Sequence, residues 1–589
     1  DFSGGEKAYR FIDENGDVKS QLNSKNRLTC DVINNTFQDQ LGNLWLSTDN
    51  GISLVMWALP VRNYQNYGNI TGIVESIARI NNSIFVGTST GIYKNNRELN
   101  QFDKLDFPAE QVWQLINIEE ENILLAATKK GIYKIDIKGN IVLLSNELED
   151  VLTITKSKKF KNIFYVGHLT GFATYKYEHG KIYLLSNNPN FNYEVRQILE
   201  DAYGNIWLST KYDGLICMLN PNIHNIKNLS LLNYIKYTTG NGLPDMNANF
   251  AYEINNKIFV ATYYGIYRLD ETKPRSNYTI SELAKLSFVK DFSIYPYPKN
   301  QYNQIKKIKF DEENKIWLLT LLPDVRYDFG VIENIKKEVK LVNQPYKTVA
   351  KDKINEFFLD SNYIWFGGTD MIQCFNKSKK YDFNHSFHSL IGSVSSINDT
   401  IFTGNYYSPI KIGDSIVNQM SLIQPEDLKK SFAYQKNDFT FQFSATSFIV
   451  DNPCKFSCFL EGEDEKWSEW TNETFKTYMN LYEGKYIFKV KAKNIFGTES
   501  TIAQYEFTIH PPWYRTTLAY ILYFVLAFGF IYGVVVIFTR NLNRIIKNQT
   551  AELQHQKDEI VHKNKEITDS IYYAKRIQDA IMPSNEYIK

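Results

Sequence analysis

The sequence predicts a mainly β protein. We expect a seven-bladed β-propeller preceded by part of another, then an Ig-like β-sandwich, one transmembrane helix and a terminal coiled-coil helix. Three observations carry this prediction: a phrase first met as "GNLWLST" (42–48) returns at intervals, short alternating strands replace it after residue 415, and an uncharged apolar run begins at Thr516. A repeat of about 40 residues with several short strands is typical of propeller blades, whereas a helical solenoid would show helical periodicity.

The repeat has nine copies, and each consists of an apolar strand, a tight turn that ends in glycine, and a second apolar strand, as in a β-hairpin. We expect its glycines to occupy equivalent turns that need a positive φ, and its aromatic residues to share one register in the blade cores. The copies lie at 38–55, 81–94, 120–136, 160–175, 200–219, 254–270, 311–333, 360–375 and, most weakly, 397–413. The glycines are Gly51, Gly91, Gly131, Gly171, Gly214 and Gly265, and the tryptophans are Trp45, Trp207, Trp317 and Trp365.

These copies resemble the two-component regulator propeller repeat, whose consensus is D-x-x-G-x-[LI]-W-[IL]-[GS]-T-x-x-G-[LI]. Residues 39–52 and 201–215 match it closely, and the resemblance covers most of 30–415. Members of that family usually carry two complete propellers, so nine copies imply that a further part precedes this chain. We therefore expect residues 1–60 to be the end of an upstream propeller or a first blade, and residues 61–420 to form one propeller.

The alternating strands at 437–448, 454–462 and 485–494 predict a β-sandwich over residues 430–510. Three patterns in this region resemble the triple-tyrosine domain that follows regulator propellers: L-x-G-x-D-x-x-W, L-x-x-G-x-Y-x-F-x-V and a closing I-x-P-P-[FW]-[WY]. The resemblance implies that Tyr486 lies in the core, that Trp467 is a packing anchor and that Pro511–Pro512 form a stiff exit.

The run from Thr516 to Thr539 carries no charge over 24 residues. At helical rise it extends about 36 Å, enough to cross a hydrocarbon core of about 30 Å. Positive charges follow it at Arg540, Arg544 and Lys547, which places the C-terminal side in the cytoplasm. We expect a transmembrane helix at 515–539 of a bacterial inner-membrane protein, with residues 1–512 periplasmic and 540–589 cytoplasmic; a buried soluble helix is the alternative.

The segment 541–584 has no glycine, and no proline before Pro583, so it predicts one continuous helix. Every seventh residue forms an apolar seam, whereas the companion seam is polar at Gln549, Gln556, Lys563 and Ser570. We expect a loosely packed homodimeric coiled coil through 540–584 that relays a signal; a solvated linker is the alternative. The relay residues are Ile546, Leu553, Ile560, Ile567, Ala574, Ile577 and Ile581.

The stretch "NKEITDSIYYAKRIQDAIMPS" (564–584) resembles the signature that leads into SpoIIE-type metal-dependent serine/threonine phosphatase domains of Bacteroidetes sensor proteins. The resemblance implies that residues 585–589 begin a phosphatase domain absent from this chain, which would bring Mn²⁺ or Mg²⁺ with it. The full-length protein would then be a phosphatase, while no catalytic residue is transferred to this chain.

Within the chain we expect no catalytic, cofactor-binding or metal-binding residue. His385 and His388 have metal-compatible spacing but no third ligand nearby, and His555 and His562 lack the context of a kinase phosphoacceptor. The net charge of +1 gives no electrostatic case for nucleic acid, and five cysteines are too few for a disulfide scaffold.

These expectations combine into a signal-transduction sensor. Its periplasmic domains would detect a ligand, and the helix would relay that event to the output domain. The ligand is open between a glycan, for which family members give precedent, and a protein of the cell envelope. Three alternatives stay open: the front half of a sensor histidine kinase, a periplasmic scaffold, and a propeller lyase or glycosidase, which lacks evident catalytic side chains.

Overall fold

The structure is a computed structural model. It describes residues 9–12, 18–22, 28, 30–64, 70–96, 101–108, 111–188, 190–221, 234–295, 303–323, 326–335, 338–349, 354–396, 399–412, 415–449 and 454–581. The chain divides into two compact units. The first contains Asp1–Ser386, Phe448–Pro453 and Lys493–Glu499, and the second contains Phe387–Ser447, Cys454–Ala492 and Ser500–Lys589.

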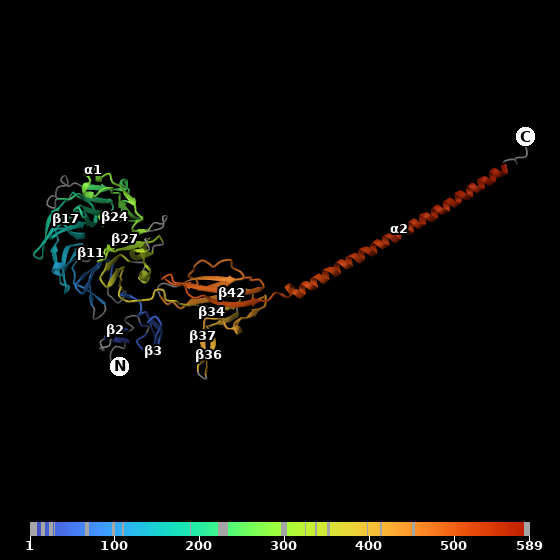
Figure 1. The fold of residues 1–589 in the computed structure, drawn as a ribbon, viewed down its shortest axis with the longest axis horizontal. Coiled ribbons are helices and arrows are strands. Elements are labelled where there is room, and N and C mark those ends of the chain that lie inside the picture. Colours follow the sequence, from blue (N-terminus) through green and yellow to red (C-terminus); the bar gives the residue numbers. More distant parts are fainter. Residues whose placement is uncertain are drawn as a thin grey trace. The chain divides into compact units, whose positions relative to one another are not determined.

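Seven four-stranded antiparallel sheets follow one another around a ring in the first unit and form the blades of a propeller (Figure 1). The first strands of neighbouring blades touch at most junctions, so they surround the propeller axis. The first blade consists of β7 (Val74–Ile80), β8 (Ser83–Thr88), β9 (Gly91–Asn96) and β10 (Gln101–Lys104). The second consists of β11 (Val112–Ile118), β12 (Ile123–Thr128), β13 (Gly131–Asp136) and β14 (Ile141–Ser145). The third consists of β15 (Val151–Lys156), β16 (Ile163–His168), β17 (Gly171–Glu178) and β18 (Lys181–Asn187).

The next three blades repeat this order. They are β19 (Val195–Glu200), β20 (Ile206–Thr210), β21 (Leu215–Met218) and β22 (Tyr234–Tyr237); β23 (Phe250–Ile254), β24 (Lys257–Thr262), β25 (Gly265–Leu269) and β26 (Phe288–Lys290); and β27 (Gln304–Phe310), β28 (Ile316–Leu321), β29 (Tyr327–Ile335) and β30 (Glu338–Val342). A short helix, α1 (Ile280–Leu283), lies between β25 and β26.

The seventh blade is completed by a strand from far earlier in the sequence. It consists of β31 (Glu356–Leu359), β32 (Tyr363–Gly367), β33 (Ile372–Asn376) and β6 (Val61–Asn63), and the Cα partners of β33 and β6 include Cys374 with Arg62. Joining the two ends of the ring within one sheet leaves no unpaired edge at the seam. The closed propeller therefore begins at Val61.

Second strands are buried along nearly their whole length, as in β12 and β16, where every residue is buried. Neighbouring blades cover both faces of such a strand, which is why the repeat is a continuous apolar run rather than an alternating one. One of the resulting clusters joins residues of the first two blades, including Phe85 and Leu124.

The first copy of the repeat lies outside the closed ring. It forms a three-stranded sheet of β3 (Ile33–Gln38), β4 (Leu44–Thr48) and β5 (Gly51–Val55), and a separate hairpin, β1 (Tyr9–Ile12) with β2 (Val18–Leu22), precedes it.

The second unit contains the sandwich. One sheet has the order β35 (Asp399–Thr403), β34 (Ser389–Ser396), β39 (Phe439–Ala445), β41 (Phe475–Tyr478); the other has β38 (Ser431–Phe432), β43 (Ala503–Ile509), β42 (Gly484–Lys493), β40 (Lys455–Glu461). A separate hairpin of β36 (Tyr406–Ile412) and β37 (Ser415–Ser421) follows β35 and precedes β38 in the chain. Tyr486 is buried in the core and stacks on Phe507, and the half-buried Trp467 stacks on Phe459.

The ninth copy of the repeat, 397–413, is not a blade, and the boundary expected at residue 420 was wrong. Its described residues form β35 and β36, and β34 beside it pairs with β39 of the sandwich. The two units divide between Ser386 and Phe387. The burial of β34 nearly alternates, as expected of a strand with one covered face, whereas blade strands are covered on both. The weak copy therefore contributes one strand to each of two neighbouring hairpins, β34 with β35 and β36 with β37.

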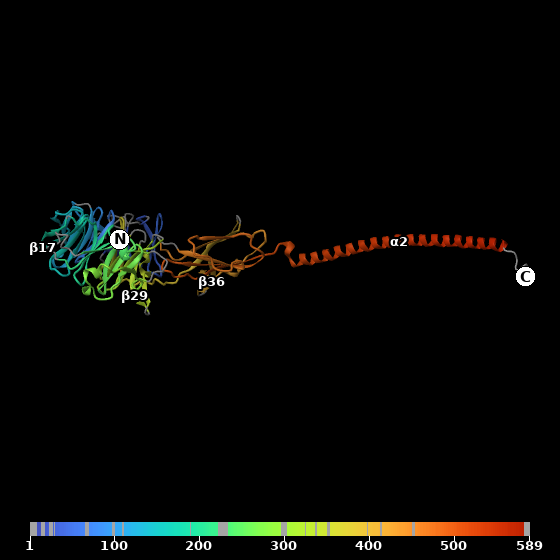
Figure 2. The same ribbon diagram turned by 90° about the horizontal axis from the view of Figure 1, so that it is seen from above.

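One helix, α2 (Thr517–Ile581), follows the sandwich without interruption over 65 residues (Figure 2). Among the described residues it is the one helix long and apolar enough to cross a membrane, by length and composition.

Candidate functional site: the propeller channel

An aspartate clamp, in which one carboxylate accepts hydrogen bonds from a turn N–H and from the tryptophan indole, accounts for the aspartate and the tryptophan of the repeat. The Asp201 carboxylate accepts hydrogen bonds from the backbone N–H of Asn205 and from the indole N–H of Trp207, both at 2.9 Å. The same bonds join Asp39 to Trp45 at 3.2 Å and Asp311 to Trp317 at 2.9 Å. An aspartate six residues before the tryptophan thus closes the turn and satisfies the indole.

The fourth repeat tryptophan, Trp365, is buried like Trp207 and Trp317, but its indole nitrogen has no hydrogen-bond partner among the described residues. The aspartate nearest before it, Asp360, forms an ion pair with Arg79 instead. Because these rings lie within the blades, they are not available to a ligand.

A threonine clamp, in which the hydroxyl donates a hydrogen bond to the carbonyl of the turn glycine, accounts for the threonine and the glycine of the repeat. The Thr128 hydroxyl donates to the carbonyl of Gly131 at 2.8 Å, and Thr210 does the same to Gly214 at 2.8 Å. Gly51, Gly91, Gly131, Gly171 and Gly265 each begin the third strand of their sheet, and Gly214 directly precedes β21.

Glycine is needed at two of these positions for different physical reasons. Gly131 has a φ of +120°, and a Cβ there would lie 2.2 Å from the carbonyl oxygen of Ser145. The φ of Gly171 lies outside the left-handed range that we expected, and a Cβ there would meet the Phe191 carbonyl at 3.1 Å. Space rather than φ excludes a side chain at Gly171.

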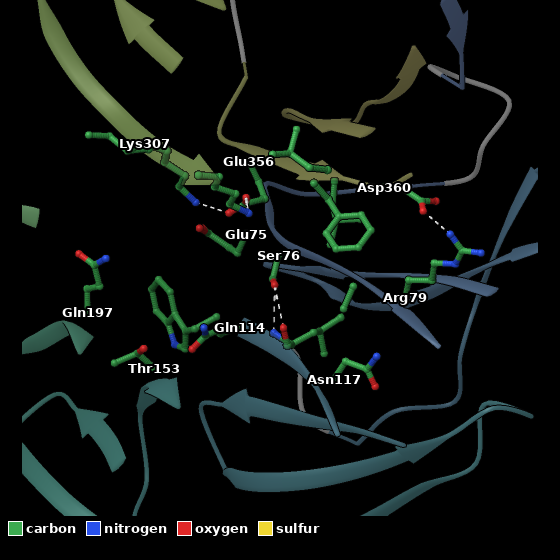
Figure 3. A pocket seen from close by; sticks show the side chains of 18 of the residues that line it. Glu75, Ser76, Arg79, Gln114, Asn117, Thr153, Gln197, Lys307, Glu356 and Asp360 are labelled. Atoms are coloured by element: carbon green, nitrogen blue, oxygen red, sulfur yellow. Dashed lines mark hydrogen bonds and ion pairs between the residues drawn. The ribbon is translucent and has the colours of Figure 1, made fainter. Parts of the chain in front are cut away.

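A cavity of about 1070 Å³ occupies the propeller axis, and first strands from all seven blades line it. Figure 3 shows side chains that line this cavity. Its lining is rich in side-chain amides, which both donate and accept hydrogen bonds. The amides belong to Asn81, Gln114, Asn117, Asn122 and Gln197.

In five of the seven blades, a β-bulge near the start of the first strand places an extra residue in the lining of this cavity. In β11, Val112 pairs with Thr128 and Gln114 pairs with Ala127, so Trp113 is the extra residue. An extra residue leaves the ladder and turns its side chain away from the regular alternation. Five blades share this feature, and all five extra residues line the cavity: Glu75, Trp113, Leu152, Arg196 and Lys306.

These five residues are not among the candidates that the sequence predicts. A signal for them exists, because each stands between a Val or Ile and a polar residue at the start of a blade, as in Val74-Glu75-Ser76 and Val195-Arg196-Gln197. Its meaning depends on the strand pairing, which the sequence pattern does not show.

Charged groups in the channel fall into paired and unpaired sets. Lys307 and Lys309 both form ion pairs with Glu356, the second at 2.5 Å. Burial by itself would raise the pKa of Glu356, but the two ammonium groups outweigh it and hold the pKa below its ordinary value. This cluster is therefore an internal ion network.

Glu75 and Lys306 have no ion pair or hydrogen bond within the part of the chain that the structure describes, although both are half-buried. Figure 3 shows Glu75 pointing toward Glu356 and Lys307. Burial raises the pKa of Glu75, and burial together with neighbouring Lys307 lowers the pKa of Lys306. A bound molecule could therefore supply a hydrogen-bond or ion-pair partner to each of these two groups.

The remaining candidate residues lie apart from the channel. The relay residues Ile546, Leu553, Ile560, Ile567, Ala574, Ile577 and Ile581 are all on α2 and are exposed. All five cysteines are free. Among the described residues, no group of three or more His, Cys, Asp or Glu side chains is placed to hold a metal ion.

Comparisons with known proteins give one family match and several similar solved structures. Residues 454–510 match the Y_Y_Y domain family. The extracellular domain of a hybrid two component system from B. thetaiotaomicron aligns with a TM-score of 0.58 and 18% identity, over 85% of this chain and 64% of that one. The extracellular domain of a one component system from the same organism aligns with a TM-score of 0.42 and 17% identity, over 86% and 69% of the two chains.

No curated protein sequence matches the chain. The chain spans less than two thirds of the first of these structures, and at this identity the likeness shows the fold alone. In fold, then, this chain is a seven-bladed propeller joined to a β-sandwich that contains a Y_Y_Y domain.

Proposed function

We propose that this chain is the extracytoplasmic and membrane-crossing part of a single-pass inner-membrane sensor. The observation that carries the proposal is the continuity of α2. One helix follows the sandwich, contains the apolar run from Thr517 onward and continues as the relay segment. A change in the sandwich therefore has a direct mechanical route to residues 540–581.

The apolar part of α2 supports a membrane crossing. Nearly all its large apolar side chains, such as Phe524, Phe530 and Ile537, are exposed in the single chain. Burying such a side chain is worth about 1.5–3 kcal/mol, so a run of them requires a cover, and lipid supplies it. The basic residues after the run orient the helix with residues 540–589 in the cytoplasm.

The relay segment supports a homodimer, because its apolar seam from Ile546 to Ile581 has no cover within the described chain. A polar companion seam makes that coiled coil weak, and weak coiled coils can adopt two packings of similar free energy. The similarity of 564–584 to the segment before SpoIIE-type domains supports a serine/threonine phosphatase as the output, with Mn²⁺ or Mg²⁺ bound by that domain; residues 582–589 lie outside the described part of the chain.

The amide-rich channel supports a hydroxyl-rich ligand, and we take a glycan as the ligand to test first. A protein of the cell envelope is the second candidate for the propeller. A histidine kinase output is the second candidate for the cytoplasmic side.

Cysteine accessibility in spheroplasts tests the crossing. An impermeant maleimide should label Ile502→Cys from outside, and should label Ile545→Cys only after the membrane is permeabilised. Labelling of Ile545→Cys in intact spheroplasts would contradict the orientation.

Phosphatase activity tests the output. A longer protein that continues past Lys589 should dephosphorylate a phosphoserine substrate with Mn²⁺ or Mg²⁺, whereas the 1–589 chain should not. Ile577→Lys, which places a charge in the one apolar position of the companion seam, should uncouple this activity from the ligand and leave propeller unfolding unchanged. A kinase ATP-binding domain after residue 589 would overturn the output.

A further inference from the structure

One end of the sandwich exposes aromatic and apolar side chains beside the start of α2. They come from the turn between β41 and β42 and from a short 3₁₀ helix at Trp513–Arg515. The exposed fractions are 70% for Met479, 63% for Tyr482, 75% for Trp513 and 41% for Tyr514. Such residues are costly in water and favourable at a membrane surface.

Arg515 holds these two segments together. Its guanidinium lies 3.2 Å from the Glu483 carboxylate and 6.0 Å from the centre of the Tyr482 ring. The rings of Tyr434 and Tyr514 lie 5.7 Å and 5.9 Å away. A cation among three aromatic rings and a carboxylate is a specific, directional contact, and its planar guanidinium cannot be replaced by lysine without loss.

The turn itself is fixed by the core of the sandwich. The Tyr486 hydroxyl donates to the carbonyl of Tyr482 at 3.0 Å, and the Tyr486 ring stacks on Phe507 with 5.4 Å between centres. The position of the turn relative to the helix start is therefore set by packed side chains, not by a free loop.

The position of this surface relative to the bilayer follows from where the uncharged run of α2 begins. Arg515 directly precedes the uncharged run that begins at Thr516. If the run enters the bilayer, as the proposed function requires, Arg515 lies at the outer interface, and the turn that it holds lies at the same depth. Aromatic side chains on both segments then fall within the headgroup layer.

We infer that the turn at residues 479–483, together with Trp513 and Tyr514, is a lipid-contact surface that seats the sandwich on the outer headgroup layer, and that Arg515 is its positioning residue. The sandwich and the first turn of α2 then move as one body on the membrane. This inference rests on the membrane crossing proposed above and adds a second contact with the lipid.

Depth-dependent fluorescence quenching tests the inference on the full 1–589 chain in nanodiscs of phosphatidylethanolamine and phosphatidylglycerol. Each variant carries one new cysteine with a fluorophore in a Cys30→Ser background. The other native thiols are buried, and burial raises the pKa of Cys374 and Cys458 to about 12, so they react slowly. Nitroxides are placed either on the lipid headgroup or deep in the acyl chain.

A probe at Met479→Cys should be quenched by the headgroup nitroxide at least about twofold more than a probe at Ile502→Cys. Ile502 is the matched control because it is exposed and precedes the other end of β43, about 20 Å along the strand from the membrane exit. Equal quenching at the two sites would overturn the lipid contact and leave the surface to a protein partner.

A probe at Phe530→Cys separates the two proposals, because the acyl-chain nitroxide should quench it if the helix crosses. Quenching at Phe530 without quenching at Met479 rejects the lipid contact alone, whereas no quenching at Phe530 rejects the crossing and the lipid contact together. Arg515→Gln should remove most of the quenching at Met479 and none at Phe530, and Arg515→Lys should retain part of it. Unchanged quenching in Arg515→Gln would reject the positioning role.

Discussion

The turns of the blades repeat the same residues, whereas the bulges of the same blades do not. Aspartate side chains hold Trp207 and Trp317 of two blades in the same way, and Trp45 of the three-stranded sheet outside the ring repeats the contact. The bulge position holds, in chain order, Glu75, Trp113, Leu152, Arg196 and Lys306.

The difference separates two kinds of constraint. A turn must satisfy its own backbone in every blade, so the same short side chains recur. A bulge residue points into a shared cavity, where neither the ladder nor the blade core dictates its type. Repetition marks what the fold needs, and variation at a repeated position marks what the channel can recognise.

The largest expected effect comes from Asp201→Ala. The Asp201 carboxylate also lies 2.6 Å from the fully buried guanidinium of Arg275, which reaches it from the loop after β25 in the next blade. Removing it leaves a buried charge short of a partner, and we expect a loss of about 3–5 kcal/mol of unfolding free energy. Denaturant unfolding followed by tryptophan fluorescence measures it.

Asp311→Ala is the matched control, because Asp311 binds the Trp317 indole in the same way and, among the described residues, no ion pair links it to a buried arginine. It should cost about 1–3 kcal/mol, the price of one unsatisfied indole N–H. Equal losses in the two variants would show that the bridge between blades contributes nothing.

Gly131→Ala comes next. The added Cβ would overlap the Ser145 carbonyl and sit at a positive φ, and we expect a loss of about 2–4 kcal/mol. Gly51→Ala meets a similar φ, +111°, with no atom within 4 Å, so it should cost only about 1–2 kcal/mol. A Gly131→Ala protein as stable as Gly51→Ala would mean that the turn relaxes freely.

The bulge position should behave in the opposite way. Lys306→Ser removes an unpaired, half-buried cation, so the unfolding free energy should change by less than about 0.5 kcal/mol. Binding of the 1–589 chain to an array of soluble polysaccharides should fall at least about tenfold. The control is Lys340→Ser, on the outermost strand of the same blade, which should change neither the unfolding free energy nor the binding. If Lys306→Ser bound polysaccharide as well as the native chain, the bulge residue would not belong to the proposed binding site.

The smallest effect is a pH dependence. Burial raises the pKa of Glu75 above its ordinary value of 4.5, so the folded protein binds this proton more tightly than the unfolded chain. The resulting stabilisation is complete below pH 4.5 and is lost as pH rises through the folded pKa. Glu75→Gln should therefore be more stable than the native chain at pH 7, by an amount that disappears near pH 4. A constant difference across this range would assign the effect to packing.

Much of the fold follows from local patterns. The blade hairpins, the alternating strands of the sandwich and the apolar run of α2 each depend on neighbouring residues, and the structure has all three. The weak copy at 397–413 misled because two short apolar strands around a glycine have the same local pattern whether they pair with each other or, as here, with two other strands.

By itself, the sequence determined the turns, the strands and the helix, because glycine geometry, side-chain clamps and apolar periodicity act over a few residues. Only the tertiary structure decided that Val61–Asn63 closes the seventh blade, that the extra residue of each bulge lines the channel, and that Arg515 reaches Glu483. Each of these is a contact between segments far apart in the chain, and such contacts depend on how complete sheets pack, which no short pattern encodes.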